Sequence, residues 1–465
     1  MATPTYFFYD LETSGIDPRT HRIMQFAGIR TTMGLEPIGE PENFLVQLSP
    51  EVMPDPEAIF VTGITPQSTS KAGMLERDAI KHILEDIFTP DTIVVGFNNV
   101  RFDDEFIRFS AYRNFFDPYA WAYADGRSRW DMLDVVRLVR ALRPDGIEWP
   151  VDSDGAPVNK LELIAAVNNI THVRAHDALS DVEALIAVAR LVRDKQPKMY
   201  EYLLKGRSKD AVGALVNPVY PAPFVYASGS FGKVNNFVSV VVPVGFGENK
   251  KVIVYDLRID PTPYLSMNVE ELRSLRFATR EQRAAEGYMP LPAKAIVPNK
   301  CPAVAPYSTL RPEDAVRLNL DSAMIMHHLA ILQESSLMAK LQEVFVRSSD
   351  FPSADDVDGG LYSGFINATS DKTAMLSVRQ ASIAELATLT PRFSDVRLPE
   401  LWVRYKGRNA PQTLTETERT IWDEYVTDRK RTNADAFAAA VAMLDRDKIT
   451  NEQVALLESL RQWAS

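Results

Sequence analysis

Strand-like and helix-like segments alternate through residues 5–200, and this alternation limits the possible folds more than any other feature. Segments rich in β-branched and aromatic residues predict strands at 5–10, 23–31, 43–48 and 92–97. Apolar residues at helical spacing predict helices at 78–88, 102–115, 131–142, 161–168 and 178–195. We therefore expect an α/β domain with a central sheet, ending where Gln196-Pro197 closes the last helix.

The remaining chain changes character twice. Short strands at 224–227, 238–244, 251–257 and 295–297, separated by turn residues, predict a small β-barrel or sheet, and helices at 322–334 and 338–345 follow. A polar stretch at 348–360 reads as a linker. Beyond it we expect helices at 382–388, 416–427, 434–444 and 451–463. The predicted domains are 1–197 (α/β), 198–350 (β-containing) and 351–465 (helical).

Composition narrows the class of protein. With 465 residues and 46% apolar content, the chain can bury more than one core. No apolar run approaches the ~20 residues that span a bilayer, and the N-terminus lacks a signal-peptide pattern. We therefore expect no membrane association. Cys301 is the only cysteine, so we expect no internal disulfide and no cysteine-based zinc site. A cytoplasmic location is the simplest account of such a chain. The net charge of −11 is concentrated in the first domain, whereas the middle is mildly basic, so nucleic acid is not excluded.

Asp10 and Glu12 lie two positions apart on the first predicted strand, so their side chains share a face. At about 4 Å and an effective dielectric of about 20, two such charges repel by roughly 4 kcal/mol. A fold tolerates this repulsion if cations lie between the carboxylates or if one of them stays protonated. Taken alone, the pair also fits two acids at the exposed end of a strand.

Asp103 opens the helix that follows the strand at 92–97. An acid there can complement the helix N-terminus, or it can join the first pair at the end of a neighbouring strand. Asp104 and Glu105 occupy the same turn, so the sequence leaves open which acid points inward.

His176 and Asp181 are five residues apart, or roughly 140° around a helix, and would not share a helical face. If Asp177 is the N-cap, however, they take the N′ and N4 positions, which touch each other. Alternatively, His176 is a loop histidine bonded to backbone and Asp181 lies on a solvated helix face.

Together, four acids and one histidine on three elements of one α/β domain match a two-metal phosphodiesterase. Oxygen ligands favour Mg²⁺ or Mn²⁺ over zinc. A histidine with a reference pKa of about 6.5 suits the removal of a proton from an attacking water. Residues 112–123 add Arg113 among several aromatics, which suits stacking on unpaired bases, although we expect Phe115 and Phe116 to be core.

The order Asp10-x-Glu12, Asp103, His176-x4-Asp181 resembles the DEDDh (DnaQ-like, ribonuclease H-like) 3′→5′ exonuclease superfamily. Further strings resemble its bacterial exonuclease I family, namely Gly96-Phe-Asn-Asn-Val-Arg-Phe-Asp-Asp-Glu105, Tyr112-Arg-Asn-Phe-Phe-Asp-Pro-Tyr-Ala-Trp121, Ser128-Arg-Trp-Asp131, Ala141-Leu-Arg-Pro144 and Thr309-Leu-Arg-Pro-Glu-Asp314. The resemblance implies an α/β ribonuclease H-like exonuclease domain, then a small SH3-like domain, then a helical C-terminal domain.

The resemblance also implies an activity: processive 3′→5′ hydrolysis of single-stranded DNA to 5′-mononucleotides, in DNA repair and recombination. Asp10, Glu12 and Asp181 would hold two Mg²⁺ ions, for which Mn²⁺ is expected to substitute. Asp103 would complete the acidic set, and His176 would be the general base. A monomer is expected.

By the same resemblance, the substrate-binding residues are Glu12, Arg108, Tyr119, Tyr123, Arg137, Arg143 and Lys160. Arg137 and Arg143 can alternatively be read as solvated helix charges. The family also binds the acidic, Phe-ending tail of single-stranded DNA-binding protein, and this pocket maps to Arg143, Arg311 and Tyr202. The alternative for Arg311 is a helix-entry residue with a local ion pair.

Three other functions stay open at this point. An exoribonuclease or polymerase-proofreading module shares the five catalytic residues, but such proteins are often little more than the first domain. A nucleic-acid-binding scaffold with an inactive nuclease pocket is disfavoured by the intact acids. A hydrolase of small phosphoesters leaves the aromatic and basic stretch at 112–123 unexplained.

Overall fold

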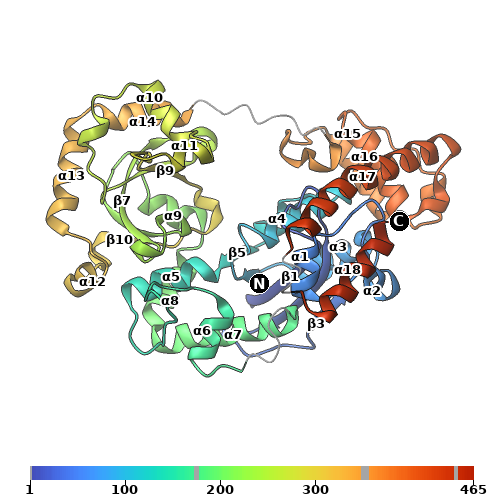
Figure 1. Cartoon of the computed structure of the whole chain (residues 1–465), viewed down its shortest axis with the longest axis horizontal. Helices are drawn as coiled ribbons and strands as arrows, with labels where there is room; N and C mark the ends of the chain where they lie inside the picture. The colour runs from blue at the N-terminus through green and yellow to red at the C-terminus, as the bar shows by residue number, and fades with distance from the viewer. Residues whose placement is uncertain (1–2, 172–176, 347–355, 445–448, 465) are drawn as a thin grey trace. The chain divides into compact units, whose positions relative to one another are not determined.

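The computed structural model describes residues 3–171, 177–346, 356–444 and 449–464. The chain forms two compact units (Figure 1). The first unit contains residues 1–129, 172–186 and 352–465, and the second contains residues 130–171 and 187–351. The predicted domain limits at 197 and 350 remain predictions. Among the described residues, no helix combines the length and the apolar character that crossing a membrane requires.

A five-stranded sheet organises the N-terminal part of the chain, in the order β3-β2-β1-β4-β5. β1 pairs antiparallel with β2 and parallel with β4, and β2 pairs antiparallel with β3. The strands are β1 (Thr5–Thr13), β2 (Ile23–Thr31), β3 (Glu42–Leu45), β4 (Thr92–Gly96) and β5 (Ser128–Asp131). β5 was not predicted, because four residues carry too little alternation to be distinguished from a loop.

Aromatic packing fixes β1 at the centre of this sheet. Residues 6–9 are all buried, as expected for a strand covered on both faces. Tyr9 stacks on Phe26 with ring centroids 6.0 Å apart, and Phe88 meets Tyr9 edge-on at 5.7 Å. A bulge in the β1–β2 pairing lies between Glu12 and Thr13. The rigid strand therefore ends in a local bend at the residues expected to bind metal.

Helices flank the sheet as predicted, with two additions. The helices here are α1 (Pro56–Thr62), α2 (Pro66–Ala72), α3 (Glu76–Lys81), which continues as a π-helical turn (His82–Ile87), α4 (Asp103–Arg113) and α7 (Ala178–Lys195), with a 3-10 turn at Ala120–Ala122. α1 and α2 were not predicted. Both have only seven residues, and each begins with proline at its first position.

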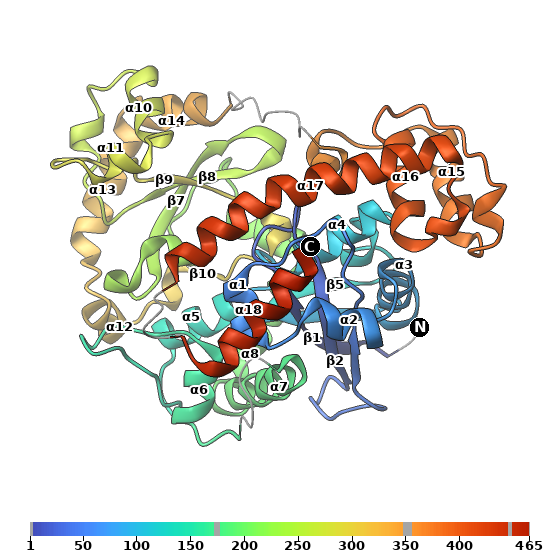
Figure 2. The ribbon, with the colours of Figure 1, turned by 45° about the vertical axis from the view of Figure 1, so that its right-hand side comes forward.

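The C-terminal part of the chain belongs to the first unit. It contains α15 (Thr369–Gln380), α16 (Leu398–Asn409), α17 (Glu416–Met443) and α18 (Asn451–Ala464), with 3-10 turns at Val357–Tyr362, Glu385–Ala387 and Pro411–Thr413. Figure 2 shows the long α17 and the α18 that follows it beside the N-terminal helices. α18 contacts α1 and α2, and Leu460 joins a core with Met24 and Leu48.

Three predictions for this part are wrong. Residues 382–388 contain only the 3-10 turn at Glu385–Ala387 and not the predicted helix. The two helices predicted at 416–427 and 434–444 are one helix, α17. The prediction divided it because residues 428–433 are all polar and show no apolar helical spacing. The predicted linker at 348–360 ends in a 3-10 helix, and Asp358 within it is only 2% exposed. Of this predicted linker, residues 348–355 lie outside the described residues.

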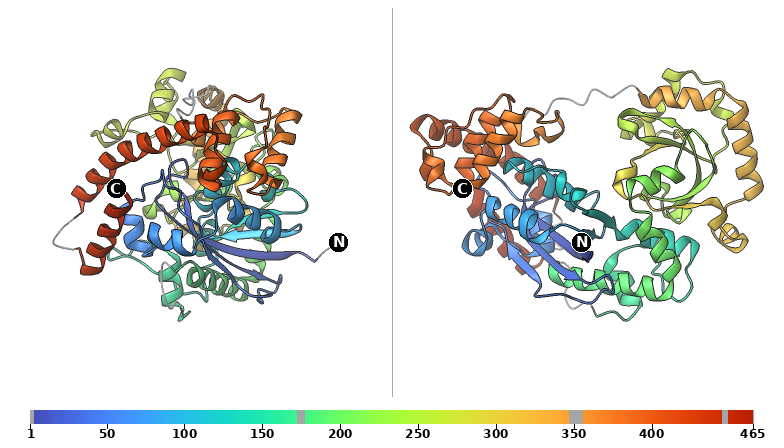
Figure 3. Two further views of the ribbon diagram at one scale, coloured as in Figure 1. Left: turned by 90° about the vertical axis from the view of Figure 1, so that its right-hand side faces the viewer. Right: turned by 180° about the vertical axis from the view of Figure 1, so that it is seen from behind.

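The second unit is built around another sheet, drawn mainly in green and yellow in Figure 3. This sheet has five strands in the order β10-β6-β7-β8-β9, and all neighbours are antiparallel. Its strands are β6 (Phe224–Ala227), β7 (Val238–Phe246), β8 (Val252–Asp256), β9 (Ala293–Ile296) and β10 (Val304–Pro306). Its helices are α5 (Met132–Leu142), α6 (Leu161–Val167), α8 (Pro197–Lys205), α9 (Lys209–Leu215), α10 (Val269–Arg276), α11 (Arg280–Ala284), α12 (Pro312–Arg317), α13 (Ser322–Glu334) and α14 (Leu337–Val346). Helix α14 packs against β7, which closes one side of the sheet.

Candidate active site

Three carboxylates from two distant parts of the sequence converge in the first unit. Asp10 and Glu12 lie on one face of β1, and Asp181 lies in the first turn of α7. One oxygen from each of the three lies within 4.8 Å of the others. In the described part of the chain this is the only group of three or more acidic, histidine or cysteine side chains so close together. The convergence agrees with the expectation for these three residues.

The electrostatics of this group favour a cation. Glu12 is only 8% exposed. Burial, followed by repulsion from Asp181, raises the pKa of Asp10 to about 8. Burial, followed by repulsion from Asp10, Asp181 and Asp177, raises the pKa of Glu12 to about 9. Without a counter-charge, Asp10 and Glu12 therefore hold protons at neutral pH. A divalent ion would displace these protons and stabilise the ionised carboxylates, which burial deprives of water.

The three acids in the first turn of α4 differ in their surroundings, and both Asp103 and Asp104 are buried. Asp104 is fully buried and is held by structural partners: it accepts hydrogen bonds from the Tyr9 hydroxyl at 2.7 Å and from the Asn99 amide at 3.2 Å, and it pairs with Arg129. Glu105 pairs with Arg108 at 2.7 Å. Asp104 and Glu105 thus have structural tasks.

Asp103 is buried beside them, with 5% of its surface exposed. It follows the carboxyl end of β4, the strand that pairs with β1 through Phe8 and Val95. Asp103 is not a member of the close three-carboxylate group among the described residues. Its predicted role as the fourth acid stays a prediction.

The proposed base, His176, lies outside the described residues. The element that follows it is as predicted, because α7 begins at Ala178 and places Asp181 fourth in the helix. The Asp181 backbone N–H donates to the Asp177 carbonyl at 3.0 Å, which starts the helical hydrogen bonding at the expected residue.

The predicted DNA-contact residues fall into both units. In the first unit, the Arg108 guanidinium lies over the Tyr119 ring at 5.7 Å, and Tyr123 is 68% exposed. Phe115 and Phe116 are buried, as expected. The structure therefore brings Arg108 and Tyr119 together.

In the second unit, Arg137 pairs with Asp134 at 2.7 Å and lies over the Phe237 ring at 5.1 Å. The ammonium group of Lys160 lies 3.8 Å from Glu162, and its side chain is 69% exposed. Arg137 is thus a mostly buried helix residue, whereas Lys160 is available to solvent.

The residues predicted to bind a partner tail lie in the second unit. Arg143 and Arg311 both reach the buried Asp314, at 3.3 Å and 2.8 Å. The Tyr202 hydroxyl donates to the Val304 carbonyl at 3.3 Å, and the ring is 38% exposed. The structure brings the two arginines together as expected. The local ion pair that the alternative reading of Arg311 required is also present.

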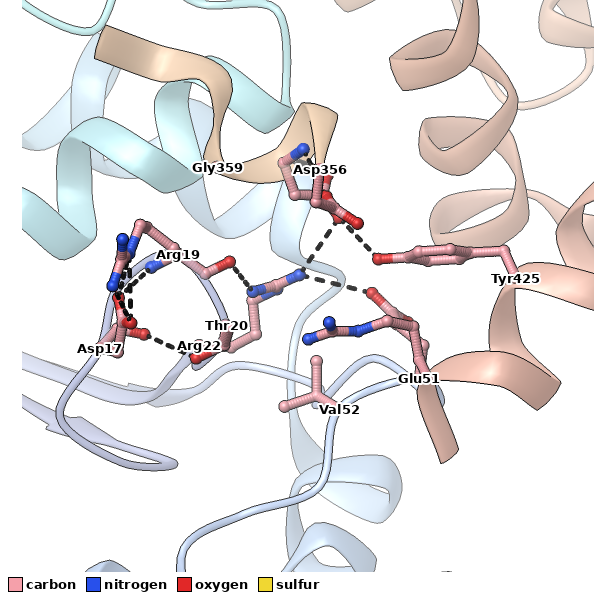
Figure 4. A pocket seen from close by; sticks show the side chains of 11 residues that line it. Asp17, Arg19, Thr20, Arg22, Glu51, Val52, Asp356, Gly359 and Tyr425 are labelled. Carbon is pink, nitrogen blue, oxygen red and sulfur yellow. Dashed lines mark hydrogen bonds and ion pairs between the residues drawn. The ribbon is translucent and has the colours of Figure 1, made fainter. Parts of the chain in front are cut away.

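A buried charge cluster, which no sequence motif indicates, joins the two ends of the chain (Figure 4). Arg22 ion-pairs with Glu51 at 3.5 Å and with Asp358 at 3.7 Å. Arg408 pairs with the same two acids, and the Tyr425 hydroxyl donates to Asp358 at 2.9 Å. A cavity of about 180 Å³ adjoins this cluster. The loop after Glu12 is thereby tied to the C-terminal helices.

Comparison with known proteins places three family models along the chain: "Exonuclease" at residues 7–189, "Exonuclease I SH3-like domain" at 207–347 and "Exonuclease I C-terminal domain" at 355–465. The order matches the predicted architecture.

Two curated relatives named exodeoxyribonuclease I match nearly the whole chain. The Haemophilus influenzae protein is 37% identical over 463 residues, covering 99% of this chain and 98% of its own. The Escherichia coli protein is 39% identical over 469 residues, covering 99% and 97%. The zinc-bound crystal structure of the E. coli exonuclease I complex with single-stranded DNA aligns with a TM-score of 0.94 at 37% identity, covering 100% of this chain and 99% of the other.

Proposed function

Because the chain belongs to the exodeoxyribonuclease I family, we propose that it degrades single-stranded DNA from the 3′ end to 5′-mononucleotides, processively, in DNA repair and recombination. The observation that carries this proposal is the convergence of the Asp10, Glu12 and Asp181 carboxylates within 4.8 Å. The E. coli structure with single-stranded DNA, which aligns over the whole chain, supports the choice of substrate.

The donor set suits divalent metal, and two ions are proposed. It consists of carboxylate oxygens only, which Mg²⁺ prefers, and Mn²⁺ is expected to substitute. Asp10, Glu12 and Asp181 would hold the ions, with Asp103 completing the acidic set. When bound, the ions stabilise charge on the attacking and leaving oxygens of the phosphodiester. The zinc-bound E. coli structure supports a metal site in this fold.

Side chains of the protein would accept the proton of the attacking water and position the terminal nucleotide. His176 would accept the proton of the attacking water as a new P–O bond forms. The bond between the terminal phosphorus and the 3′ oxygen of the preceding nucleotide breaks, which releases a 5′-mononucleotide. The departing 3′ oxygen takes up a proton from solvent water and becomes the new 3′-hydroxyl of the strand. The Glu12 carboxylate would also contact the terminal nucleotide, which places the reacting phosphate beside the acids.

The strand would be held by basic and aromatic side chains in both units. In the first unit, Arg108 and Tyr119 already contact each other, and Tyr123 is exposed beside them in sequence. In the second unit the proposed contacts are Arg137, Arg143 and Lys160. Arginine and lysine would bind phosphates and tyrosine would stack on bases, which gives grip without sequence preference.

A second, protein ligand is proposed for the second unit: the acidic, Phe-ending tail of single-stranded DNA-binding protein at Arg143, Arg311 and Tyr202. Arg317 also pairs with Asp314, at 2.9 Å. Three guanidinium groups therefore surround one buried carboxylate, which favours a further anion such as a terminal carboxylate. Arg311→Glu should weaken binding of a tail peptide without slowing digestion of a free oligonucleotide. Unchanged peptide affinity would contradict this assignment.

The activity is tested by digesting one single-stranded oligonucleotide labelled at either end, with Mg²⁺ or with EDTA, beside a matched RNA. With Mg²⁺, the 3′ label should appear at once as a mononucleotide, whereas the 5′-labelled strand should pass from full length to short products with few intermediates, because digestion is processive. RNA should be degraded much more slowly. Asp10→Ala should abolish release, and Asp423→Ala, an exposed acid on α17, should not. Stepwise shortening from the 5′ end, or equal rates on RNA, would contradict the proposal.

A further inference from the structure

The cavity of about 180 Å³ beside the buried charge cluster lies within the first unit. Its walls come from the loop between β1 and β2, from Glu51 and its neighbour, from the segment that opens the 3-10 turn at Val357–Tyr362, and from α17. Figure 4 shows the Arg22 guanidinium pointing toward the Glu51 carboxylate, while Tyr425 reaches in from α17. The volume exceeds the ~10–15 Å³ that one water requires, but it lies below the ~300–1,000 Å³ of sites for drug-sized ligands. The cavity therefore suits a small polar ion.

Two almost fully buried side chains in the wall have polar atoms without a hydrogen-bond partner among the described residues. Arg22, which is 4% exposed, has an unpartnered Nε, and Glu51, which is 1% exposed, has an unpartnered Oε2. Arg429 on α17 also lines the cavity, and its buried Nε has no partner in the same part of the chain. Unpaired buried polar atoms destabilise a fold. A ligand that accepts from both arginines and donates to Glu51 would remove this cost.

The charge balance around the cavity favours an anion. The acids in its wall already pair with arginines, as Asp17–Arg19, Glu51–Arg408, Asp356–Arg404 and Asp358–Arg408. Burial opposes the ionisation of Asp358, but Arg408, Arg404 and Arg22 outweigh burial and hold its pKa well below the ordinary value. Arg429, by contrast, has no carboxylate partner in the part of the chain that the structure describes. Because guanidinium groups stay protonated, the charge left over at the cavity is positive.

The unpartnered oxygen of Glu51 restricts which anion fits. The Glu51 carboxylate, paired with Arg22 and Arg408, can only accept hydrogen bonds, so an anion beside it must carry a proton. Hydrogenphosphate has one P–OH group to donate to Glu51, and its charged oxygens can accept from Arg22 and Arg429. Sulfate is fully ionised at neutral pH and would place an acceptor against an acceptor. The arrangement of donors and acceptor therefore favours phosphate over sulfate.

We propose that this cavity binds inorganic phosphate, as hydrogenphosphate, between Arg22, Arg429 and Glu51. The bound ion would link the loop at 14–22, which follows the metal-binding end of β1, to α17 of the C-terminal part. It would thereby stabilise the contact between these two segments of the first unit. The site shares no residue with the three-carboxylate group, and the proposal does not depend on the proposed nuclease activity.

The test is isothermal titration calorimetry of the full chain with sodium phosphate near neutral pH, in EDTA and at constant ionic strength. EDTA removes any metal that could itself bind phosphate. Sulfate should bind at least about tenfold more weakly than phosphate. Thymidine 5′-monophosphate should not bind, because its nucleoside exceeds the cavity. Phosphate should also raise the melting temperature by about 3–5 °C for each tenfold increase above its dissociation constant, and hydrogen exchange should slow in residues 14–22 and in α17.

Three variants separate the site from a general effect of salt. Arg429→Gln should lose phosphate binding but keep the wild-type melting temperature in phosphate-free buffer, because Arg429 makes no ion pair among the described residues. Glu51→Gln introduces an amide that can donate, and should bind sulfate as well as phosphate. Arg431→Gln is the matched control on the same helix, since the Arg431 side chain is 81% exposed, and should bind phosphate normally.

The comparison of Arg429→Gln with Arg431→Gln decides the matter even if Glu51→Gln does not fold. No phosphate binding by the folded wild type, or unchanged binding by Arg429→Gln, would overturn the site and leave the cavity to ordered water. Equal affinity of the wild type for sulfate, or for thymidine 5′-monophosphate, would also contradict the proposal.

Discussion

The Tyr9 hydroxyl donates a hydrogen bond to Asp104 at 2.7 Å, and this contact ties the first turn of α4 to the strand that carries Asp10 and Glu12. Asp104 also pairs with the buried Arg129. Adjacent acids in one helical turn therefore have different tasks: Asp104 organises the site, and Asp103 is proposed to complete it.

Substituting Asp103 and Asp104 one at a time should separate the catalytic role from the structural one. Asp104→Ala removes the carboxylate that pairs with the buried Arg129 and accepts from the Tyr9 hydroxyl, and should destabilise the fold by about 3–5 kcal/mol. Asp103→Ala should lower the exonuclease rate strongly and leave the melting temperature within about 2 °C of the wild type. Thermal unfolding and nucleotide release, measured on the same preparations, compare the two. A stable, inactive Asp104→Ala protein would reverse the assignment.

Removal of the proposed base gives a second prediction. His176→Ala should lower the rate of mononucleotide release by about 10²–10⁴-fold, the usual effect of losing a general base. Single-strand binding in EDTA should be unchanged, because the imidazole acts on water and not on the strand. Single-turnover kinetics separate the chemical step from binding. A rate within threefold of the wild type would remove His176 from the mechanism.

Acid stability should depend on Glu76. Burial opposes its ionisation, but Arg113, at 3.0 Å, together with Arg22 and Arg408, outweighs burial and lowers the pKa of Glu76 to about 2. Because the folded-state pKa lies below the ordinary value of about 4.5, the ionised form stabilises the fold above that value. This contribution, about 3 kcal/mol, is lost as the pH falls toward 2.

The measurement is the melting temperature of wild type and Glu76→Gln as a function of pH. The difference should be largest above about pH 5 and should narrow as the pH falls through about 4 and 3. Glu57→Gln, an exposed acid in the first turn of α1, is the control and should show no such trend. A pH-independent difference would show that Glu76 acts through packing alone.

The buried ion pairs of Asp358 lead to a prediction about the stability of the C-terminal helices. Asp358 is 2% exposed and pairs with Arg404 at 3.0 Å and with Arg408. Asp358→Ala leaves both guanidinium groups short of a partner and should cost about 3–5 kcal/mol. Hydrogen exchange should increase in α16 and α17 first. The exposed pair of Asp428 and Arg431 provides the control, since Asp428→Ala should change neither exchange nor stability.

Where the periodicity is strong and turn residues bound it, the sequence predicts elements to the residue. β2, β6 and α13 have the predicted limits. The predictions fail where an element is not marked by apolar spacing or is held by residues far away in the sequence. Residues 428–433 of α17 are polar, so no apolar face reveals the helix, and Asp358 is held by arginines some 50 positions away, which made its segment look like a linker.

Some features of the candidate active site could likewise be predicted from the sequence, and others could not. A period of two on β1 predicts that Asp10 and Glu12 share a face. That Asp181 joins them was expected from the family resemblance and not from any local pattern. The choice between Asp103 and Asp104 depends on Tyr9 and Arg129, which no local pattern connects to that turn. The contact between Tyr119 and Phe365 was not predicted, because the two rings come from segments about 240 residues apart and share no motif.

The central claim is that the three converging carboxylates hold divalent metal. Anomalous diffraction from crystals of the full chain soaked in Mn²⁺ tests it most directly. We predict manganese peaks within about 2.0–2.3 Å of carboxylate oxygens of Asp10, Glu12 and Asp181, the range of such bonds in proteins, and no peak there in Glu12→Gln with Asp181→Asn. A wild-type crystal with manganese elsewhere and none among these three carboxylates would contradict the account.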